Sequence, residues 1–294
     1  MIINLYTIII MAFTHQDTEC MALALKLSQF GRKAVGANPM VGCVISRDDK
    51  IIAQDYHRLY GEAHAEVNAL EKINYKGENA KVYITLEPCS HFGKTPPCAE
   101  ALIRAGVKKV FIAMLDPNPL VSGRGMRVLQ DSGIEVEVGL LEEEANKINR
   151  GFVKRMITGL PFVTSKIAMS LDGRTAMKNG ESKWITSEAS REDVQMLRSL
   201  NQAILTGSGT IKSDNPMMTV RTENANSNPL RVVVDSNNII TNKSLNIFSS
   251  DANTLILNNN NSEILANGKL DLKSALKKLG EMGINNLLLE AGSG

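Results

Sequence analysis

The sequence contains few aromatic residues, few cysteines and no excess of charge of either sign. Aromatics make up 4% of the 294 residues, and there are four cysteines. So few cysteines in so long a chain exclude a disulfide scaffold. Lysine and arginine total 33 against 31 acidic residues, a formal net charge of +2. This balance argues against nucleic acid as the main partner, because binding its phosphates needs a clustered basic excess.

Long hydrophobic runs are also scarce. The apolar stretch at residues 2–13 is too short to cross a bilayer, which needs about 20 residues. No basic residue precedes it and no small-residue cleavage pattern follows, so we do not expect a signal peptide. We interpret residues 1–12 as an upstream extension, with Met11 as the start, and expect a cytoplasmic protein without a membrane partner.

The length and the residue pattern predict two globular α/β domains. A chain of 294 residues is about twice the usual domain length. We place the first domain at 13–155 and the second at 156–294, with the boundary in a polar, glutamate-rich helical stretch over 140–158. Strands alternate with single helices, which implies crossover connections and largely parallel sheets covered on both faces.

Periodicity and end signals predict the individual elements. In the first domain we expect helices over 17–31 (capped by Asp17), 63–73, 99–105 and 123–133, and strands over 40–46, 51–54, 81–85, 109–113 and 134–138. In the second we expect strands over 162–168, 203–206, 230–234, 254–257 and 286–289, and helices over 187–199 and 271–282.

One group of residues in the first half has the chemistry of a metal site. His64-Ala-Glu66 opens an expected helix, Pro88-Cys89 follows an expected strand, and Cys98 comes nine positions later. One imidazole and two thiolates suit Zn²⁺ and leave the fourth position open for a water molecule. Glu66 is the carboxylate that would move its proton. The order is typical of zinc deaminases acting on nucleobases, although their Cys-x-x-Cys spacing is stretched here.

Each of these residues alone would more often be structural, and only their combination points to zinc. Cys20 and Cys43 lie in apolar periodic runs, so we expect both to be small buried apolar side chains.

Several segments around this group carry a family resemblance. Residues 38–43, 61–66, 85–91, 93–98 and 116–119 resemble the bifunctional deaminase/reductases of riboflavin biosynthesis. The resemblance implies a cytidine-deaminase-like three-layer domain that hydrolytically deaminates 2,5-diamino-6-(5-phosphoribosylamino)pyrimidin-4-one. It implies zinc ligation by His64, Cys89 and Cys98 and proton transfer by Glu66. It also implies substrate binding by Asn38, His57 and Lys94, where Asn38 suits a pyrimidine edge and Lys94 a phosphate.

The second half lacks the strand–Gly-x-Gly-x-x-Gly–helix motif. A lone Gly207-Ser-Gly-Thr210 follows an expected strand and is either an ordinary turn or a phosphate cradle. Residues 166–176, 180–187, 214–216 and 234–236 continue the family resemblance, which here implies a dihydrofolate-reductase-like fold. That domain would use NADPH to reduce the ribosyl group of the deaminated product, 5-amino-6-(5-phosphoribosylamino)uracil, to ribityl.

The resemblance also implies site residues in this half. For the cofactor these are Ala168, Trp184, Thr210, Asp214, Ser236 and Gly292, and for the substrate Ser182, Arg198, Met218, Arg221 and Glu290. Arginine forks suit the substrate phosphate. Two residues have a purely structural alternative. Trp184, the single tryptophan, could belong to the core instead of contacting the cofactor. Asp172 could assist proton transfer or only stabilise a turn.

The last residues, 287–294, form an expected strand that runs into a glycine-rich turn. In the family this turn opens a helix that receives cofactor phosphate, so we expect a C-terminally incomplete reductase domain. One alternative is therefore a deaminase whose second domain is a binding or structural module. Another is a deaminase of RNA or a free nucleoside, for which the sequence offers only basic pairs such as Lys108-Lys109. A complete reductase domain would favour a homo-oligomer.

Overall fold

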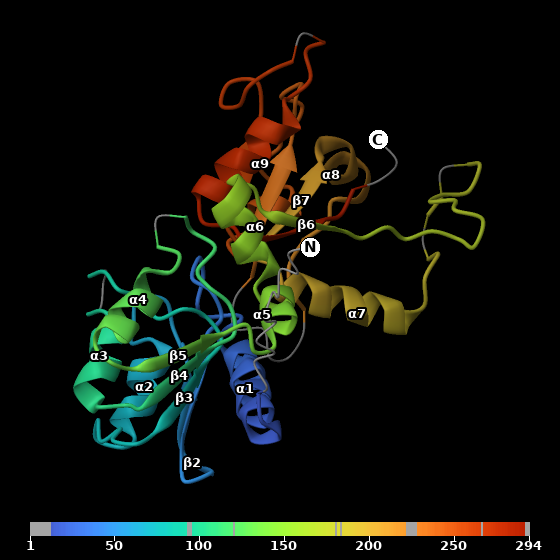
Figure 1. Ribbon diagram of the computed structural model, residues 1–294. Coiled ribbons are helices and arrows are strands. Elements are labelled where there is room, and N and C mark those ends of the chain that lie inside the picture. The colour runs from blue at the N-terminus through green and yellow to red at the C-terminus, as the bar shows by residue number, and fades with distance from the viewer. Residues whose placement is uncertain are drawn as a thin grey trace, which may run out of the picture. The chain divides into compact units, whose positions relative to one another are not determined.

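The computed structural model describes residues 13–92, 96–119, 121–179, 181–182, 184–221, 228–265 and 267–291. The chain divides into two compact units, each with its own sheet (Figure 1). Unit 1 comprises the chain up to Gly31 together with Met40–Ile148, and unit 2 comprises Arg32–Pro39 together with Asn149 onward. The predictions made for Met11, Lys94 and Gly292 fall outside the described residues. Within the described part, no helix is long and apolar enough to cross a membrane.

The sheet of unit 1 is mixed, with the strand order β2-β1-β3-β4-β5. Its strands are β1 (Gly42–Arg47), β2 (Lys50–Tyr56), β3 (Lys81–Ile84), β4 (Lys109–Ile112) and β5 (Glu135–Val138). β1 is antiparallel to both β2 and β3, whereas β3, β4 and β5 are parallel. The antiparallel part arises from the hairpin at Asp48 and Asp49, whose positive φ angles of 48° and 60° suit a tight turn between twisted strands.

Helices cover both faces of this sheet and give the expected three layers. α1 (His15–Ser28), followed by the short helix η1 (Gln29–Gly31), lies on one face, and α2 (Ala65–Glu71), α3 (Cys98–Ala105) and α4 (Arg124–Asp131) lie on the other (Figure 1). Cys20 and Cys43 are buried in the core, as expected.

The predicted cap of the first helix is wrong by three residues. Thr14 is the cap, and its hydroxyl accepts a hydrogen bond from the Asp17 amide at 3.1 Å. The Asp17 carboxylate accepts one in return from the Thr14 amide at 3.0 Å. Asp17 is therefore the third residue of a capping box, whose acidic side chain reaches back to the cap.

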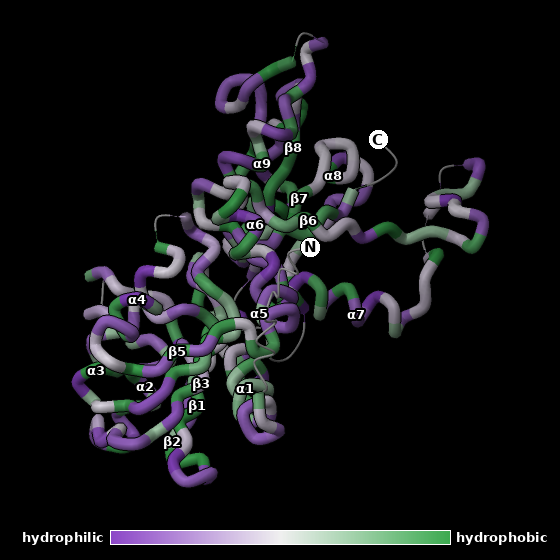
Figure 2. Tube along the Cα trace, viewed as in Figure 1, coloured by the Kyte–Doolittle hydropathy of each residue, from purple (hydrophilic) through white to green (hydrophobic). Residues whose placement is uncertain are grey.

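The sheet of unit 2 is parallel throughout, with the order β6-β10-β7-β8-β9. Its strands are β6 (Phe162–Ser165), β7 (Ala203–Gly207), β8 (Leu230–Val234), β9 (Thr254–Leu257) and β10 (Asn286–Leu289), and the 3-10 helix η2 (Asn246–Phe248) comes between β8 and β9. Figure 2 shows that β7 and β8 consist mainly of hydrophobic residues. A parallel sheet buried on both faces needs such strands.

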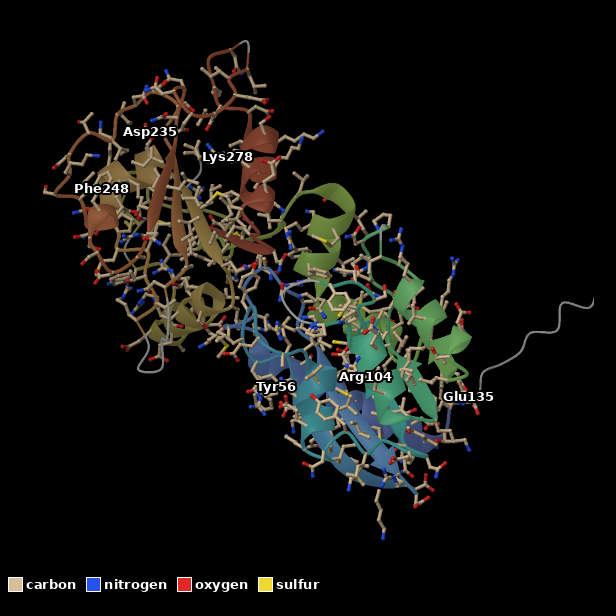
Figure 3. All side chains as sticks on the ribbon, turned by 90° about the vertical axis from the view of Figure 1, so that its left-hand side faces the viewer. Tyr56, Arg104, Glu135, Asp235, Phe248 and Lys278 are labelled. Carbon is tan, nitrogen blue, oxygen red and sulfur yellow. The ribbon has the colours of Figure 1, made fainter. Side chains whose placement is uncertain are left out.

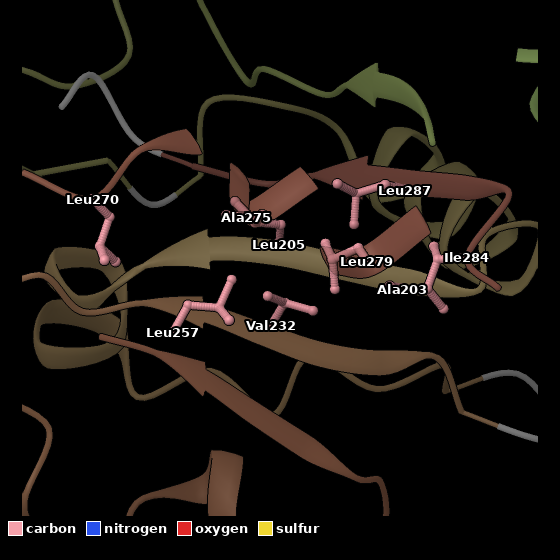
Figure 4. Close-up of a cluster of buried hydrophobic side chains, with 9 residues drawn as sticks. All are labelled: Ala203, Leu205, Val232, Leu257, Leu270, Ala275, Leu279, Ile284 and Leu287. Atoms are coloured by element: carbon pink, nitrogen blue, oxygen red, sulfur yellow. The ribbon is translucent and has the colours of Figure 1, made fainter. Parts of the chain in front are cut away.

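Side chains alternate between two cores on the two faces of this sheet. The first core is drawn in Figure 4 and contains Ala203 and Leu205 of β7 together with Ala275 and Leu279 of α9 (Leu272–Glu281). Ile204, between the two β7 residues, belongs to the second core. Alternate side chains of β7 therefore point to opposite faces of the sheet, and those of Ala203 and Leu205 pack in the same core as α9.

The single helix predicted over 140–158 is instead two helices. α5 (Glu142–Ile148) ends before Asn149, and α6 (Arg150–Thr158) begins after it. Gly151 of α6 packs against β10 so closely that a Cβ atom there would lie 2.4 Å from Asn286 Oδ1. The remaining helices of unit 2 are α7 (Glu188–Ser199) and α8 (Ser208–Asp214).

We expect Asp55→Asn to remove part of the acid dependence of stability. Asp55 is buried in β2, directly before Tyr56, the residue labelled in Figure 3. It accepts hydrogen bonds from Arg58 and Lys72 at 2.6 and 2.8 Å. Burial raises the pKa of this carboxyl, but the hydrogen bonds from Arg58, Lys72 and the Tyr56 amide outweigh burial and lower it to about 2. A lowered pKa stabilises the fold above pH 4, and this contribution of about 2 kcal/mol is lost between about pH 4 and pH 2.

Urea unfolding of both proteins at pH 6 and at pH 2.5 measures this effect. The difference in the free energy of unfolding between wild type and variant should shrink at the lower pH. Glu143→Gln, in a fully exposed pair with Lys147, is the control and should change little at either pH. A wild-type advantage that stays constant with pH would contradict the assignment.

Candidate active sites

Two helix starts and one loop bring three metal-ligating side chains together in unit 1. His64 directly precedes α2, Cys98 is the first residue of α3, and Cys89 follows β3 by a short loop. Their ligand atoms all lie within 4.8 Å of one another. His64 Nδ1 is 3.2 Å from Cys98 Sγ and 3.6 Å from Cys89 Sγ.

These separations fit a tetrahedral zinc site. Bonds of about 2.0–2.3 Å at tetrahedral angles put nitrogen and sulfur ligands about 3.6 Å apart. The Cys98 amide donates a hydrogen bond to Cys89 Sγ at 3.3 Å. Hydrogen bonds from Cys98 and His64 outweigh burial and lower the pKa of the Cys89 thiol, which favours the thiolate that binds metal. Three such donors leave one coordination position for water.

Glu66 is a buried carboxyl next to this group. It is the second residue of α2 and 3% exposed, and its Oε2 has no hydrogen-bond partner among the described residues. Burial raises the pKa of Glu66 to about 7. A carboxyl with a free oxygen and such a pKa can accept a proton from water and release it near neutral pH.

Of the residues expected to bind the deaminase substrate, His57 lies beside the metal-ligating group, whereas Asn38 belongs to unit 2. The His57 ring meets the His64 ring edge-on, with centroids 5.2 Å apart, and burial lowers the pKa of His57 and favours its neutral form. Asn38 lies in Arg32–Pro39, the segment that packs with unit 2, where the neighbouring Ala37 carbonyl accepts a hydrogen bond from Arg155 at 2.8 Å. The substrate-binding roles of His57, Asn38 and Lys94 stay predictions.

Glu87 was not singled out by sequence analysis. It is 5% exposed, and its carboxylate accepts hydrogen bonds from the amides of Asp116, Gly123 and Met126 at 3.0, 2.9 and 3.2 Å. It therefore holds the segment 116–126 against the chain that leads into Cys89. The sequence does contain a sign of this role, because Glu87 is an acidic residue that follows the apolar strand β3 closely. A buried charge requires partners.

Unit 2 contains a cleft of about 980 Å³, a size suited to a cofactor. The expected cofactor residues Ala168, Trp184, Thr210, Asp214 and Ser236 and the expected substrate residues Ser182, Arg198, Met218 and Glu290 all line it. Arg221 is exposed and is not part of the lining. Thr206 also lines the cleft, and its buried Oγ1 has no partner among the described residues, so it is available to a polar ligand. The cleft therefore fits NADPH.

The guanidinium of Arg198, which was expected to bind phosphate, is paired with the carboxylate of Glu290. Arg198 Nε and Nη2 donate to Glu290 at 2.6 and 3.0 Å, and Nη1 donates to the Thr219 carbonyl at 3.0 Å. Lys166, another residue that sequence analysis did not assign, lies with its Nζ 3.2 Å from Glu290. Burial raises the pKa of Glu290, but Arg198 and Lys166 outweigh burial and keep it lowered, so the carboxylate is ionised.

The structure decides between the alternatives for two residues. Trp184 is 72% exposed in the cleft wall, so the core alternative for the tryptophan is wrong. Asp172 accepts hydrogen bonds from Ser170 and Arg174 across a turn in which Gly173 has a φ of 79°. Asp172 is outside the cleft lining, so its geometry fits the turn-stabilising alternative.

The two units and their sites define an α/β enzyme with a zinc-deaminase centre and a separate nucleotide-cofactor cleft. Comparison with known families agrees for each unit. Residues 14–114 match the cytidine and deoxycytidylate deaminase zinc-binding region, and residues 161–294 match the RibD C-terminal domain.

Full-length relatives cover most of the chain. The riboflavin biosynthesis protein RibD of Escherichia coli is 43% identical over 306 residues, which cover 94% of this chain and 82% of that protein. RibD of Aquifex aeolicus is 39% identical over 287 residues, covering 94% and 81%. The solved structure of Acinetobacter baumannii RibD matches with a TM-score of 0.86 at 41% identity, covering 94% and 81%.

The chain belongs to the RibD family of riboflavin-biosynthesis proteins. It is a bifunctional enzyme with a zinc-dependent deaminase domain of cytidine-deaminase-like fold and an NADPH-dependent reductase domain.

Proposed function

We propose that unit 1 deaminates a diaminohydroxyphosphoribosylaminopyrimidine and that unit 2 reduces the resulting 5-amino-6-(5-phosphoribosylamino)uracil. A Thermotoga maritima protein of solved structure is named for these two activities, and it matches this chain at 36% identity with a TM-score of 0.85. The observation that carries the proposal is the buried Glu66 beside the His64–Cys89–Cys98 group, with an Oε2 atom that has no hydrogen-bond partner among the described residues. Such a pair of features suits hydrolytic removal of an amino group.

In the deamination, His64, Cys89 and Cys98 would hold zinc, which when bound would activate a water molecule near neutral pH by lowering its pKa. The Oε2 atom of Glu66, which has no hydrogen-bond partner among the described residues, can accept a proton from the attacking water. With a pKa of about 7, Glu66 can then deliver the proton to the departing amine. Neutral His57, packed against His64, helps to fix the orientation of that ligand.

In the reduction, a dinucleotide bound in the cleft would supply the hydride, and the residues that line the cleft would position it beside the substrate. Glu290 is held by Arg198 and Lys166 and presents a fixed negative charge in the cleft wall. The exposed Trp184 ring offers a flat apolar surface. The substrate that we propose is thus the small phosphorylated pyrimidine for which the Thermotoga maritima protein is named. The cytoplasmic location and the homo-oligomer stay predictions.

Stepwise assays of the 294-residue chain test the order of the reactions. With zinc and the diaminopyrimidine, we expect ammonia release without NADPH and no NADPH oxidation before ammonia appears. Supplying the deaminated uracil directly should allow immediate NADPH oxidation. Reduction of the diaminopyrimidine itself, before any ammonia forms, would contradict the proposed order.

A further inference from the structure

Three cations line the cleft of unit 2: Lys166, Arg198 and Lys269. The first two already pair with Glu290. Within the described part of the chain, no residue forms an ion pair or hydrogen bond with the Lys269 ammonium. A phosphorylated ligand that enters this cleft therefore meets one positive charge that is not yet neutralised.

The backbone of Lys269 is well anchored at the wall of the cleft. Its amide donates to Asn267 Oδ1 at 3.0 Å, and its carbonyl accepts from the Leu265 amide at 2.8 Å. The next residue, Leu270, is buried in the core shown in Figure 4. These contacts hold the backbone of Lys269, an exposed residue, at the wall of the cleft.

A second contact joins this turn to the end of β8. The Leu270 amide donates to Ser236 Oγ at 3.4 Å, and Ser236 lies just beyond β8. In open parallel sheets, ligands bind beyond the carboxyl ends of the strands. Arg198 and Glu290 meet the cleft from α7 and from the end of β10, so Lys269 lies at the Ser236 side of the lining.

We propose that Lys269 binds a phosphate ester in the cleft, and that its position beside Ser236 selects the 2′-phosphate of NADPH. This inference rests on the proposed reductase function and on the expected contact of Ser236 with the cofactor. NADH has a hydroxyl group where NADPH has this doubly charged phosphate, so a lysine here distinguishes the two dinucleotides. An ammonium is a compact charge well suited to such a group.

Titration of the 294-residue protein with NADPH and with NADH tests the assignment. Lys269→Met should weaken NADPH binding by about 10- to 100-fold, as expected for loss of a charge-assisted hydrogen bond, and should change NADH binding less than about twofold. Lys269→Arg should retain most of the preference. Lys273→Met, on the exposed side of α9 and outside the cleft lining, is the matched control and should change neither affinity.

The outcomes separate the sources of the phosphate. Unchanged dinucleotide binding with a raised KM for the phosphoribosyl substrate would assign the Lys269 contact to the substrate phosphate and overturn the cofactor assignment. Equal loss for both dinucleotides, or no change in any measurement, would overturn phosphate selection by Lys269 altogether. Failure of the wild-type protein to bind either dinucleotide would instead overturn the proposed use of the cleft.

Discussion

Glu66→Gln is expected to lower the deaminase kcat by about 100- to 10,000-fold while the protein keeps its zinc. Glutamine has the same shape but cannot accept and return the proton of the attacking water. The three zinc ligands are untouched, because His64, Cys89 and Cys98 supply the metal-binding atoms. Ammonia release measured on samples of known zinc content checks the prediction.

Two controls accompany this variant. Glu71→Gln changes an exposed acid on the same helix, α2, and should leave deamination unchanged. NADPH oxidation with the deaminated uracil should also be unchanged in Glu66→Gln, because the cleft of unit 2 is lined by residues of that unit. Deamination at the wild-type rate in a zinc-loaded Glu66→Gln protein would refute the proton-transfer role.

Glu87→Gln is expected to weaken zinc binding by about 10- to 100-fold, the usual effect of losing a residue that orients a metal ligand. The carboxylate accepts three amide hydrogen bonds, and an amide side chain would turn its NH₂ group toward donors. The segment 116–126 and the chain entering Cys89 would then separate. Competition with a coloured zinc chelator measures the affinity directly.

A general loss of stability must be distinguished from this effect. Asp17→Asn is the matched control, since Asp17 is also a buried acid that joins separate elements, with Tyr83 Oη donating to it at 2.7 Å. It should lower the free energy of unfolding without changing zinc affinity. If Glu87→Gln behaved in the same way, Glu87 would be structural only, and its role in positioning Cys89 would be wrong.

The group of metal-ligating residues could be predicted from local patterns, because metal binding depends on the types of the residues and on their order in the sequence. One imidazole, two thiols and a nearby carboxylate have few other uses in combination, and the structure brings His64, Cys89 and Cys98 together. Strands such as β8 and β10 were also predicted at their observed bounds. Their continuous apolar runs are what a parallel sheet buried on both faces requires.

What the sequence did not reveal depends on distant contacts. Arg198 was expected to face phosphate, but Glu290, 92 positions away, occupies its fork. The role of Glu87 depends on hydrogen bonds from the amides of Asp116, Gly123 and Met126, which lie about 30 to 40 positions later in the sequence. Periodicity and composition are local quantities and carry no information about such pairs.

The short segment Arg32–Pro39 has a consequence for dividing this protein into parts. It lies far upstream of Asn149, yet it belongs to the second compact unit. There the Gly36 carbonyl accepts from Gln202, and the Ala37 carbonyl accepts from Arg155 and Asn285. A gene fragment beginning at codon 149 would lack these two carbonyl acceptors, although Gln202 and Arg155 would keep their bonds to Gly283 and Asn285. We therefore expect a reductase half that includes a graft of residues 32–39 to be more stable than one made by a single cut.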